Sequence, residues 1–572
     1  MPTAAFTKDH ASGPVGSPDH GRNTVDDGHH LGQHGHRPGG KAKGPHVMTR
    51  KPAAAAAIAG LALMCSLAAC APRSAAPSQA AAEPGTLTVG LPGSLSTLDV
   101  AHETGIINYY VAQVSSEGLL GVDAQGELVP AVASSHTTAD GRTWVFQIRD
   151  DARFQDGNPV TIDDVLFSID VARDPDRSPS SSVYWPAGTD VSQTGDSEIT
   201  ITLPAPAQNF GWTVTANGGL WITEKSYYEA AGAYGSAKDL IMGTGPYRAV
   251  EFQPDSKAVF VKSGTWWGGD TSAQKIEFDF FSDENSRLLA QRAGQIDVSV
   301  QIPADQVGQF EAIDGTTVHT ESDRSYVGLT FDEAVEPFND IHVRRAVAHA
   351  VDRASIVASV LSGRGEAATG IEPPDQLGSQ IGEDAARALL ATLPNTEFDL
   401  DKAREELAAS HVPSGFEAEL TYPASIPEMG NAALAIADNL KKIGVTLTVT
   451  SKPLEEWISQ VGTGEYGLYY MSYTPTTGDA GEIPGWLLGE ANPARYSNPE
   501  VASLIAQSNA QADPAARAQD LVSATAIAQE NVIYSPIWWG KSTSAFSSRV
   551  APKDFGSYFF MTPWTASLDL VQ

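Results

Sequence analysis

Residues 338–347 read FNDIHVRRAV, and the tripeptide VDR follows at 351–353. Around this stretch, apolar residues recur at helical spacing and fall near one face: Val343, Val347, Ala350, Val351, Val357 and Leu361. The pattern predicts a structural helix over 342–361. Arg344 and Arg345 lie off the apolar face, so we expect them at the rim of this helix or in ion pairs.

Elsewhere in the sequence, strand and helix patterns are interspersed. Apolar and polar side chains alternate at 86–90 (TLTVG) and at 143–149 (TWVFQIR), which is typical of half-buried strands. Residues 106–120 carry apolar side chains at helical spacing. The sequence therefore predicts a mixed α/β protein.

A group of acidic residues at 154–165 (FQDGNPVTIDDV) could be mistaken for a catalytic or metal site. Asp156 and Gly157 favour a tight turn, and Thr161 stands where it can cap a following helix. Asp163 and Asp164 then fall in the first turn of that helix, where its dipole favours negative charge. We interpret these acids as helix-stabilising residues.

Length, composition and charge limit the class of protein. The chain has 572 residues, of which 42% are hydrophobic and 19% are charged, so it can bury more than one domain's core and is not wholly disordered. Lys and Arg number 37 against 69 Asp and Glu, a formal net charge of −32. We therefore expect no nucleic-acid partner.

Residues 48–70 have the architecture of a secretory signal, with a cationic start, an apolar run and small residues before a cysteine. The apolar run is too short and too rich in alanine for a membrane-spanning helix. Leu67-Ala68-Ala69-Cys70 resembles a bacterial lipobox, which implies cleavage of 48–69 and a lipid on Cys70. The composition of residues 70–85 then predicts a flexible tether between the lipid anchor and a globular body.

The first 47 residues hold seven of the 13 histidines, and His29, His30, His34 and His36 have metal-ligand chemistry. Their Gly, Pro, His and Asp content cannot build a core. A hydrophilic leader would also hinder recognition of the signal that follows. We expect Met48 to be the true start, with 1–47 a misassigned or disordered leader.

Several motifs in order resemble the family 5 extracellular solute-binding proteins, which include the dipeptide, oligopeptide and nickel receptors of ABC importers. They are LVPAVAS at 128–134, the FQDGNP turn at 154–159, GTGPY at 243–247, GQID at 294–297, the 338–353 stretch, 401–407, 440–445 and YSNPEV at 496–501. The resemblance extends from about residue 86 to 564.

This resemblance implies a two-lobed α/β fold of the periplasmic-binding-protein type, in the large three-domain variant of type II, with a hinge and an interlobe ligand cleft. Residues 86–330 would form lobe 1, with a second domain inserted at about 120–240. Residues 331–529 would form lobe 2, and 530–572 would return to lobe 1. Residues 326–330 and 534–538 would be strands that cross between the lobes.

The resemblance also places aromatic side chains near the cleft. The predicted ligand contacts are Tyr109, Tyr184, Trp185, Tyr326, Tyr473, Asp479, Trp486 and Trp538. Peptide-binding relatives carry a Trp-x-x-Asp-Tyr-Pro-Asp pattern whose aspartate anchors the peptide's α-ammonium group. Here Tyr473 stands near the tryptophan, a threonine falls where the acid is expected, and Asp479 is displaced by several residues.

Charge adds a hypothesis about the ligand. Residues 453–494 contain no Lys or Arg but six acids: Glu455, Glu456, Glu465, Asp479, Glu482 and Glu490. We therefore expect a neutral or cationic ligand rather than a free carboxylate.

Enzyme motifs are missing from the sequence. There is no Gly-x-Ser-x-Gly elbow and no His-Glu-x-x-His pair, and the six histidines after Cys70 lack ligand spacing. Gly540-Lys541-Ser542-Thr543 resembles the end of a P-loop, but Ser535 replaces the required first glycine. We expect a non-enzymatic protein without cofactor or metal.

The resulting hypothesis is a monomeric, lipid-anchored receptor on the outer face of the cell membrane. It would bind an oligopeptide or related small polar solute and deliver it to ABC permease subunits. The alternatives are a sensing or adhesion lipoprotein on the same fold, or a receptor for a sugar-like solute, an amine or a metal chelate. A secreted hydrolase would instead show turnover.

Overall fold

The computed structural model describes residues 84–102 and 105–571, which all lie within one of the two compact units into which the chain divides. The predicted leader, the signal peptide and Cys70 lie outside the described residues, as does most of the predicted tether.

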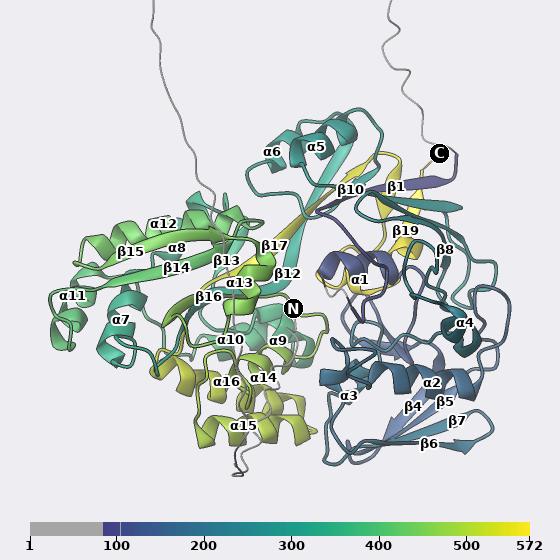
Figure 1. The fold of residues 1–572 in the computed structure, drawn as a ribbon, viewed down its shortest axis with the longest axis horizontal. Helices are drawn as coiled ribbons and strands as arrows, with labels where there is room; N and C mark the ends of the chain where they lie inside the picture. Colours follow the sequence, from purple (N-terminus) through teal and green to yellow (C-terminus); the bar gives the residue numbers. More distant parts are fainter. Residues whose placement is uncertain (1–83, 103–104, 572) are drawn as a thin grey trace, which may run out of the picture. The chain divides into compact units, whose positions relative to one another are not determined.

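The largest element is a nine-stranded mixed sheet that runs through the described part of the chain (Figure 1). Its path is β16 (Leu468–Tyr473), β12 (Thr316–Phe331), β17 (Tyr534–Ser547), β11 (Val298–Ser299), β1 (Thr86–Pro92), β10 (Lys275–Phe281), β9 (Lys257–Lys262) and β8 (Tyr247–Gln253), with β13 (Gly365–Ala367) paired to β17. β1 pairs in parallel with both β10 and β11. The strand predicted at 86–90 is thus confirmed at the centre of this sheet.

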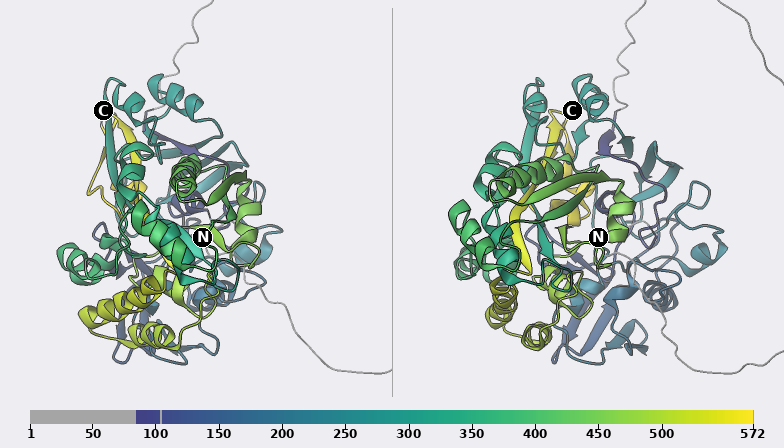
Figure 2. Two further views of the ribbon diagram at one scale, coloured as in Figure 1. Left: turned by 90° about the vertical axis from the view of Figure 1, so that its left-hand side faces the viewer. Right: turned by 60° about the vertical axis from the view of Figure 1, so that its left-hand side comes forward.

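Two long strands, β12 and β17, run side by side and antiparallel (Figure 2). Residues 316–322 of β12 pair with 541–547, and residues 326–330 pair with 534–539. Between these two segments the register shifts, and Arg324 there adopts a positive φ of 60°. The two predicted crossing strands are therefore paired to each other, with an irregularity at 323–325.

Four smaller sheets complete the strands. They are β4 (Ala133–Thr138), β5 (Thr143–Ile148), β7 (Glu198–Thr202) and β6 (Asp190–Gly195) in that order, the parallel pair β14 (Glu417–Pro423) and β15 (Thr446–Lys452), and the antiparallel pairs β2 (Leu120–Val122) with β3 (Leu128–Pro130) and β18 (Val550–Pro552) with β19 (Leu568–Leu570). The strand predicted at 143–149 is β5.

Helices fill the connections between strands. Those before β12 are α1 (Ile106–Ala112), α2 (Ile162–Ala172), η1 (Ser182–Tyr184), α3 (Phe210–Thr213), α4 (Lys225–Ala230), α5 (Glu284–Arg292) and α6 (Val307–Glu311). Those between β12 and β17 are α7 (Ile341–His349), α8 (Arg353–Ser359), α9 (Pro374–Ile381), α10 (Glu383–Leu390), α11 (Leu400–Ala409), α12 (Pro427–Lys441), α13 (Leu454–Gln460), α14 (Glu482–Leu488), α15 (Pro499–Ala510) and α16 (Pro514–Glu530). Near the C-terminus lie η2 (Phe559–Met561) and η3 (Trp564–Ser567).

The buried side chains form separate cores on the two sides of the β12–β17 irregularity. We call residues 332–533 the second lobe and the other described residues the first lobe. The first lobe holds one core around β1, β8, β9 and β10, and another that extends from Leu119 to Ile222 around β5 and β7. The second lobe and the adjoining strand ends hold two more. The predicted domain boundaries themselves stay a prediction.

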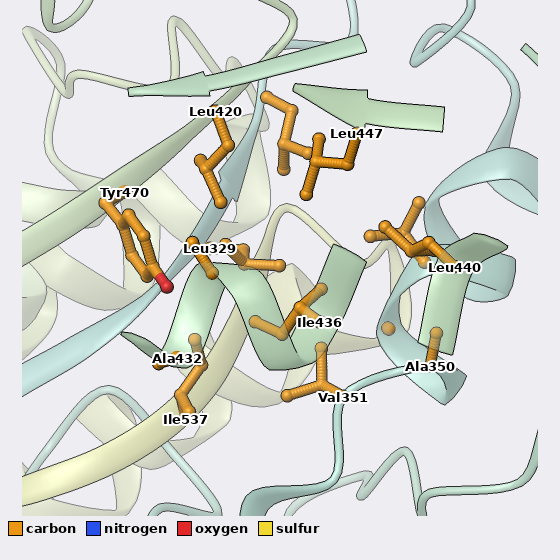
Figure 3. Close-up of a cluster of buried hydrophobic side chains, with 14 of the residues drawn as sticks. Leu329, Ala350, Val351, Leu420, Ala432, Ile436, Leu440, Leu447, Tyr470 and Ile537 are labelled. Atoms are coloured by element: carbon orange, nitrogen blue, oxygen red, sulfur yellow. The ribbon is translucent and has the colours of Figure 1, made fainter. Parts of the chain in front are cut away.

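One second-lobe core shows why α12 forms and where it packs (Figure 3). Ala432, Ile436 and Leu440 recur at helical spacing and are fully buried. They pack with Leu420 of β14 and Leu447 of β15 in the same cluster. α12 therefore fixes the parallel β14–β15 pair against the large sheet.

The helix predicted over 342–361 is wrong in its extent. The structure has α7 and α8 instead, because the chain leaves helical geometry after Ala350 and the Asp352 side chain caps a new helix by accepting from Ser355 N. For Arg344, the rim alternative is wrong, whereas the ion-pair alternative is confirmed by its Nη2, which lies 3.8 Å from Glu333 Oε2. This arginine is only 4% exposed and donates to the carbonyl oxygens of Phe338 and Asn531.

Two other local predictions can be compared with the structure. Thr161 caps α2 in a complete capping box with Asp164, which confirms the interpretation of the 154–165 acids. The helical pattern at 106–120 yields only the short α1, which ends at Ala112.

Candidate functional site

Three tyrosines from separate parts of the chain share the electrostatic environment of one glutamate. Tyr109 lies in α1, Tyr184 ends η1, Tyr473 ends β16, and Glu482 begins α14. Burial raises the pKa of all three phenols, and the charge of Glu482 raises each pKa further. Because Tyr109 and Tyr184 belong to the first lobe and the other two residues to the second, this group is an interlobe cluster.

Glu482 is held by a set of donors rather than by a cation. Its carboxylate accepts from Tyr473 Oη and from the backbone nitrogens of Thr476 and Thr477, each at 2.9 Å, and from Thr477 Oγ1. No ion pair found among residues 84–102 and 105–571 includes it. Burial is the main effect on this carboxyl and raises its pKa, while the hydrogen bonds act in the opposite direction. The cluster therefore contains an acid without a compensating cation.

Three buried polar atoms belong to Tyr184, to its chain neighbour Trp185 and to Thr476. Tyr184 Oη, Thr476 Oγ1 and Trp185 Nε1 are all buried and form no hydrogen bond of ordinary geometry, although the side chains of Thr476 and Tyr473 interact with the Tyr184 hydroxyl. Such atoms normally find partners, because an unpaired buried polar group costs about 1–3 kcal/mol. The hydroxyls of Tyr184 and Thr476 therefore have hydrogen-bonding capacity that ordinary contacts leave unused.

The lobes also contact each other through residues outside this cluster. Asn209 Nδ2 donates to Asp479 Oδ2 at 2.8 Å, Gln208 N donates to Asn509 O at 2.8 Å, and Tyr558 Oη donates to Asp375 O at 3.3 Å. A cavity of about 30 Å³ remains near Arg324 and Thr474. That volume suits a water molecule, whereas another cavity, of about 340 Å³, lies between the lobes and is lined by Asn209 of the first lobe and by Ser379 and Arg517 of the second.

A family model described as bacterial extracellular solute-binding proteins, family 5 Middle, matches residues 127–494, which is well over half of the chain. The chain belongs to this family.

Individual relatives agree with the assignment. Protein XP55 of Streptomyces lividans is 26% identical over 420 residues, covering 70% of this chain and 74% of that protein. The oligopeptide-binding protein OppA of Bacillus subtilis is 23% identical, covering 76% of this chain and 83% of its own. The periplasmic binding protein DppA of Helicobacter pylori, solved with the peptide STSA, superposes with a TM-score of 0.72 at 20% identity, covering 86% and 98% of the two chains. The predicted periplasmic-binding-protein fold is confirmed.

In this family 5 solute-binding protein, some of the eight predicted contacts do come together. Tyr109, Tyr184 and Tyr473 are in the interlobe cluster. Trp486 stacks on Tyr473, with ring centroids 6.4 Å apart and planes at 27°. Trp185 follows Tyr184 in the chain and packs edge-on against Phe210, with its Nε1 unpartnered. Their contact with a ligand stays a prediction.

Three other predicted contacts occupy different environments. Tyr326 is fully buried in a second-lobe core, and Trp538 is 5% exposed in the other one. Asp479 forms a buried ion pair with Arg517, Oδ1 to Nη2 at 2.6 Å, while its Oδ2 accepts from Asn209. The structure therefore gives Tyr326 and Trp538 packing roles, and it gives Asp479 a role in the contact between the lobes.

The residues that sequence reasoning did not select as contacts are Glu482, Thr476 and Thr477. Glu482 was one of six acids in a segment without Lys or Arg, and the sequence alone gave no reason to prefer it. Its position two residues before Pro484, on a short helix that directly follows the Tyr473 loop, is the signal that could have distinguished it.

The described residues also bear on membrane and metal binding. In the parts of the chain that the structure places, no helix has the length and apolar character needed to cross a bilayer. Within the same residues, no group of three or more His, Cys, Asp and Glu could hold a metal ion. The four histidines at 29–36 lie outside this range.

Proposed function

We propose that this solute-binding protein is the receptor of an ABC importer and takes up peptides or related solutes that carry an ammonium group. Relatives named for oligopeptide binding and a similar fold solved with a tetrapeptide support the peptide class. The observation that carries the proposal is Glu482, which lies between the lobes amid three phenols and has four donors but no cation.

The chemistry of the cluster favours a cationic end group. A ligand ammonium could donate to the Glu482 carboxylate and lie against the rings of Tyr473 and Trp486, which attract cations through their faces. Tyr184 Oη and Thr476 Oγ1 would serve the polar atoms next to the ammonium group. Contacts to both lobes would favour their closure around the ligand.

The remaining parts of the proposal concern the form of the receptor. A lipid on Cys70 would tether a monomeric body to the outer face of the cell membrane and keep it near the permease. The receptor would release its ligand chemically unchanged, without cofactor or metal.

A binding screen of the Cys70→Ala protein, purified without denaturation, tests the function. Native mass spectrometry would first reveal any co-purified solute. Thermal shift and calorimetry would then compare the peptide Ser-Thr-Ser-Ala with its N-acetylated form. We expect the free peptide to raise the melting temperature in proportion to the logarithm of its concentration, as binding linkage requires. Acetylation should weaken binding about tenfold or more, because it removes a charge-assisted hydrogen bond.

Equal affinity for the free and acetylated peptides would contradict the role of Glu482 but leave peptide binding intact. Tight binding of an anionic solute, with no binding of peptides or amines, would contradict the proposed ligand class. Products of ligand cleavage in the mass spectra would contradict the receptor function itself.

A further inference from the structure

The first lobe contains a second cavity, separate from the interlobe cluster. Its volume is about 280 Å³, and Glu482 and the three clustered tyrosines are not among its lining residues. The walls come from the loop after α1, the β2–β3 hairpin, residues 215–217, residues 266–268 and residues 561–567. An engineered protein cavity of about 150 Å³ binds benzene, so this volume accommodates a molecule of one or two rings.

The walls are apolar over much of their extent. Leu120, Val122, Val129, Pro130, Met561 and Pro563 line the cavity together with Trp266 and Trp267. Aromatic and aliphatic walls with a few polar groups are typical of small-molecule sites. The polar groups therefore decide which class of molecule the cavity accepts.

One polar group is Glu117, which is only 4% exposed. Its carboxylate accepts from Trp266 Nε1 at 3.2 Å, Trp267 Nε1 at 3.1 Å and Thr244 Oγ1 at 2.8 Å. No ion pair in the described part of the chain involves it, and burial raises the pKa of this carboxyl. The nearby Arg149 guanidinium lies 3.6 Å from the centroid of the Trp267 ring and is paired with Asp151. Glu117 thus gives the cavity a buried acid that three donors hold and that the charge of Arg149 compensates only in part, because burial still raises its pKa.

The second polar group is Gln113, also 4% exposed. Asn217 Nδ2 donates to Met561 O, which can only accept, so Asn217 Oδ1 faces Gln113 and accepts from its Nε2. This chain fixes the orientation of the Gln113 amide. Its Oε1 is left buried without a hydrogen-bond partner. Gln113 therefore offers a preoriented acceptor in the lining of the cavity.

We propose that this cavity is a second ligand site, for a small amphipathic amine. The ammonium group would donate to Gln113 Oε1 within the field of Glu117, and the apolar body would pack against the tryptophan rings and the aliphatic walls. A buried acceptor and a buried acid both reject a carboxylate, since it would bring further negative charge without donors. The site involves none of the interlobe contacts and goes beyond the proposed receptor function.

Isothermal titration calorimetry with phenethylamine tests the site, with 3-phenylpropanoate as the anionic molecule of similar shape. Both compounds are titrated into the unmodified protein and into the Glu482→Gln variant. Because the variant lacks the acid of the interlobe cluster, binding that it retains is assigned to the cavity. We expect phenethylamine to bind both proteins at this site and the carboxylate to bind neither there. Ala566→Phe, which places a ring in the cavity, should weaken amine binding about tenfold or more.

The matched control is Ala551→Phe, the same change at an exposed position of β18, and it should leave binding unchanged. Gln113→Met, which keeps the volume and removes the acceptor, should also weaken binding by about tenfold. The Gln113→Met variant still tests the site if the Ala566→Phe variant does not fold. Absence of amine binding, binding unaffected by Gln113→Met, or loss of all binding in Glu482→Gln would overturn the proposal.

Discussion

Asn209 and Asp479 are 270 positions apart in the sequence, yet the amide of the first donates to the carboxylate of the second at 2.8 Å. Asp479 is at the same time paired with Arg517, and both of these side chains are about nine-tenths buried or more. One carboxylate thus joins the first lobe to the ion-pair network of the second. Because the contact spans the two lobes, any separation of the lobes would break it.

Removing this contact should weaken ligand binding without touching the ligand. Asn209→Ala deletes a hydrogen bond to a charged group, which is worth about 1.5–3 kcal/mol. The closed state becomes less favoured, and we expect affinity to fall about tenfold or more. Asn209→Asp should weaken binding further, because it places two carboxylates together. Calorimetry measures both effects, and unchanged affinity in both variants would show that this contact does not contribute to closure.

Glu482→Gln should abolish the preference for cationic ligands. The amide keeps the size of the side chain but loses its charge, so we expect affinity for a free-amine peptide to fall about tenfold or more, with little change for the acetylated peptide. Glu490→Gln changes an exposed acid of the same segment and serves as the control. A comparable loss for both peptides would instead indicate that Glu482 positions the loop around Thr476.

The stability of the second lobe should depend on pH through Glu372. This carboxyl is fully buried, accepts from Thr525 Oγ1 at 2.5 Å, and has its pKa raised to about 7 by burial. Because the native state holds this proton more tightly than the unfolded chain, stability is greatest below the ordinary carboxyl pKa of 4.5 and falls as pH rises towards 7. The expected loss between pH 5 and pH 8 is about 2–3 kcal/mol.

Glu372→Gln should remove that part of the pH dependence, whereas Glu405→Gln, a change at an exposed position of α11, should leave it in place. Urea denaturation of the Cys70→Ala protein at the two pH values provides the comparison. A pH profile unchanged by Glu372→Gln would exclude this carboxyl as the titrating group.

The capping box at the start of α2 gives a local stability prediction. Thr161→Ala removes the side-chain cap on Asp164 N and should cost about 1 kcal/mol. Thr161→Ser keeps the hydroxyl and should therefore retain most of the stability that the alanine variant loses. Hydrogen exchange of the α2 amides should become about fivefold faster in the alanine variant and remain near the original rate in the serine variant. Equal rates in the two variants would contradict the capping role.

The structure follows the sequence-based predictions where a local pattern has one physical meaning. The alternation at 86–90 and 143–149 produced strands, and Thr161 with its following acids produced a cap. The strands at 326–330 and 534–538 were located through family motifs. In each case the residues that carry the signal are neighbours in the chain, so the signal does not depend on distant packing.

The predictions were wrong where the environment of a side chain depends on contacts with a distant segment of the chain. The sequence left Arg344 open between the rim and an ion pair, and it could not show that the carbonyl of Asn531, far along the chain, accepts from this buried side chain. Tyr326 and Trp538 lie on strands covered on both faces, so alternation cannot tell a core side chain from one in the cleft. Asp479 looked available because nothing in the sequence links it to Arg517 or Asn209.

The paired strand ends at Phe331 and Ile533 have a consequence for the modularity of this protein. Phe331 N donates to Ile533 O at 2.9 Å, so the chain enters and leaves the second lobe through two adjacent backbones, while β13 and β16 of that lobe pair with β17 and β12. A segment with neighbouring ends can be exchanged or excised with a short linker while the rest of the chain keeps its path. Lobes with different pocket walls could therefore be recombined at this junction, provided that the exchanged segment keeps the pairing of β13 and β16 with the large sheet. A chimaera joined there would inherit part of its specificity from each parent.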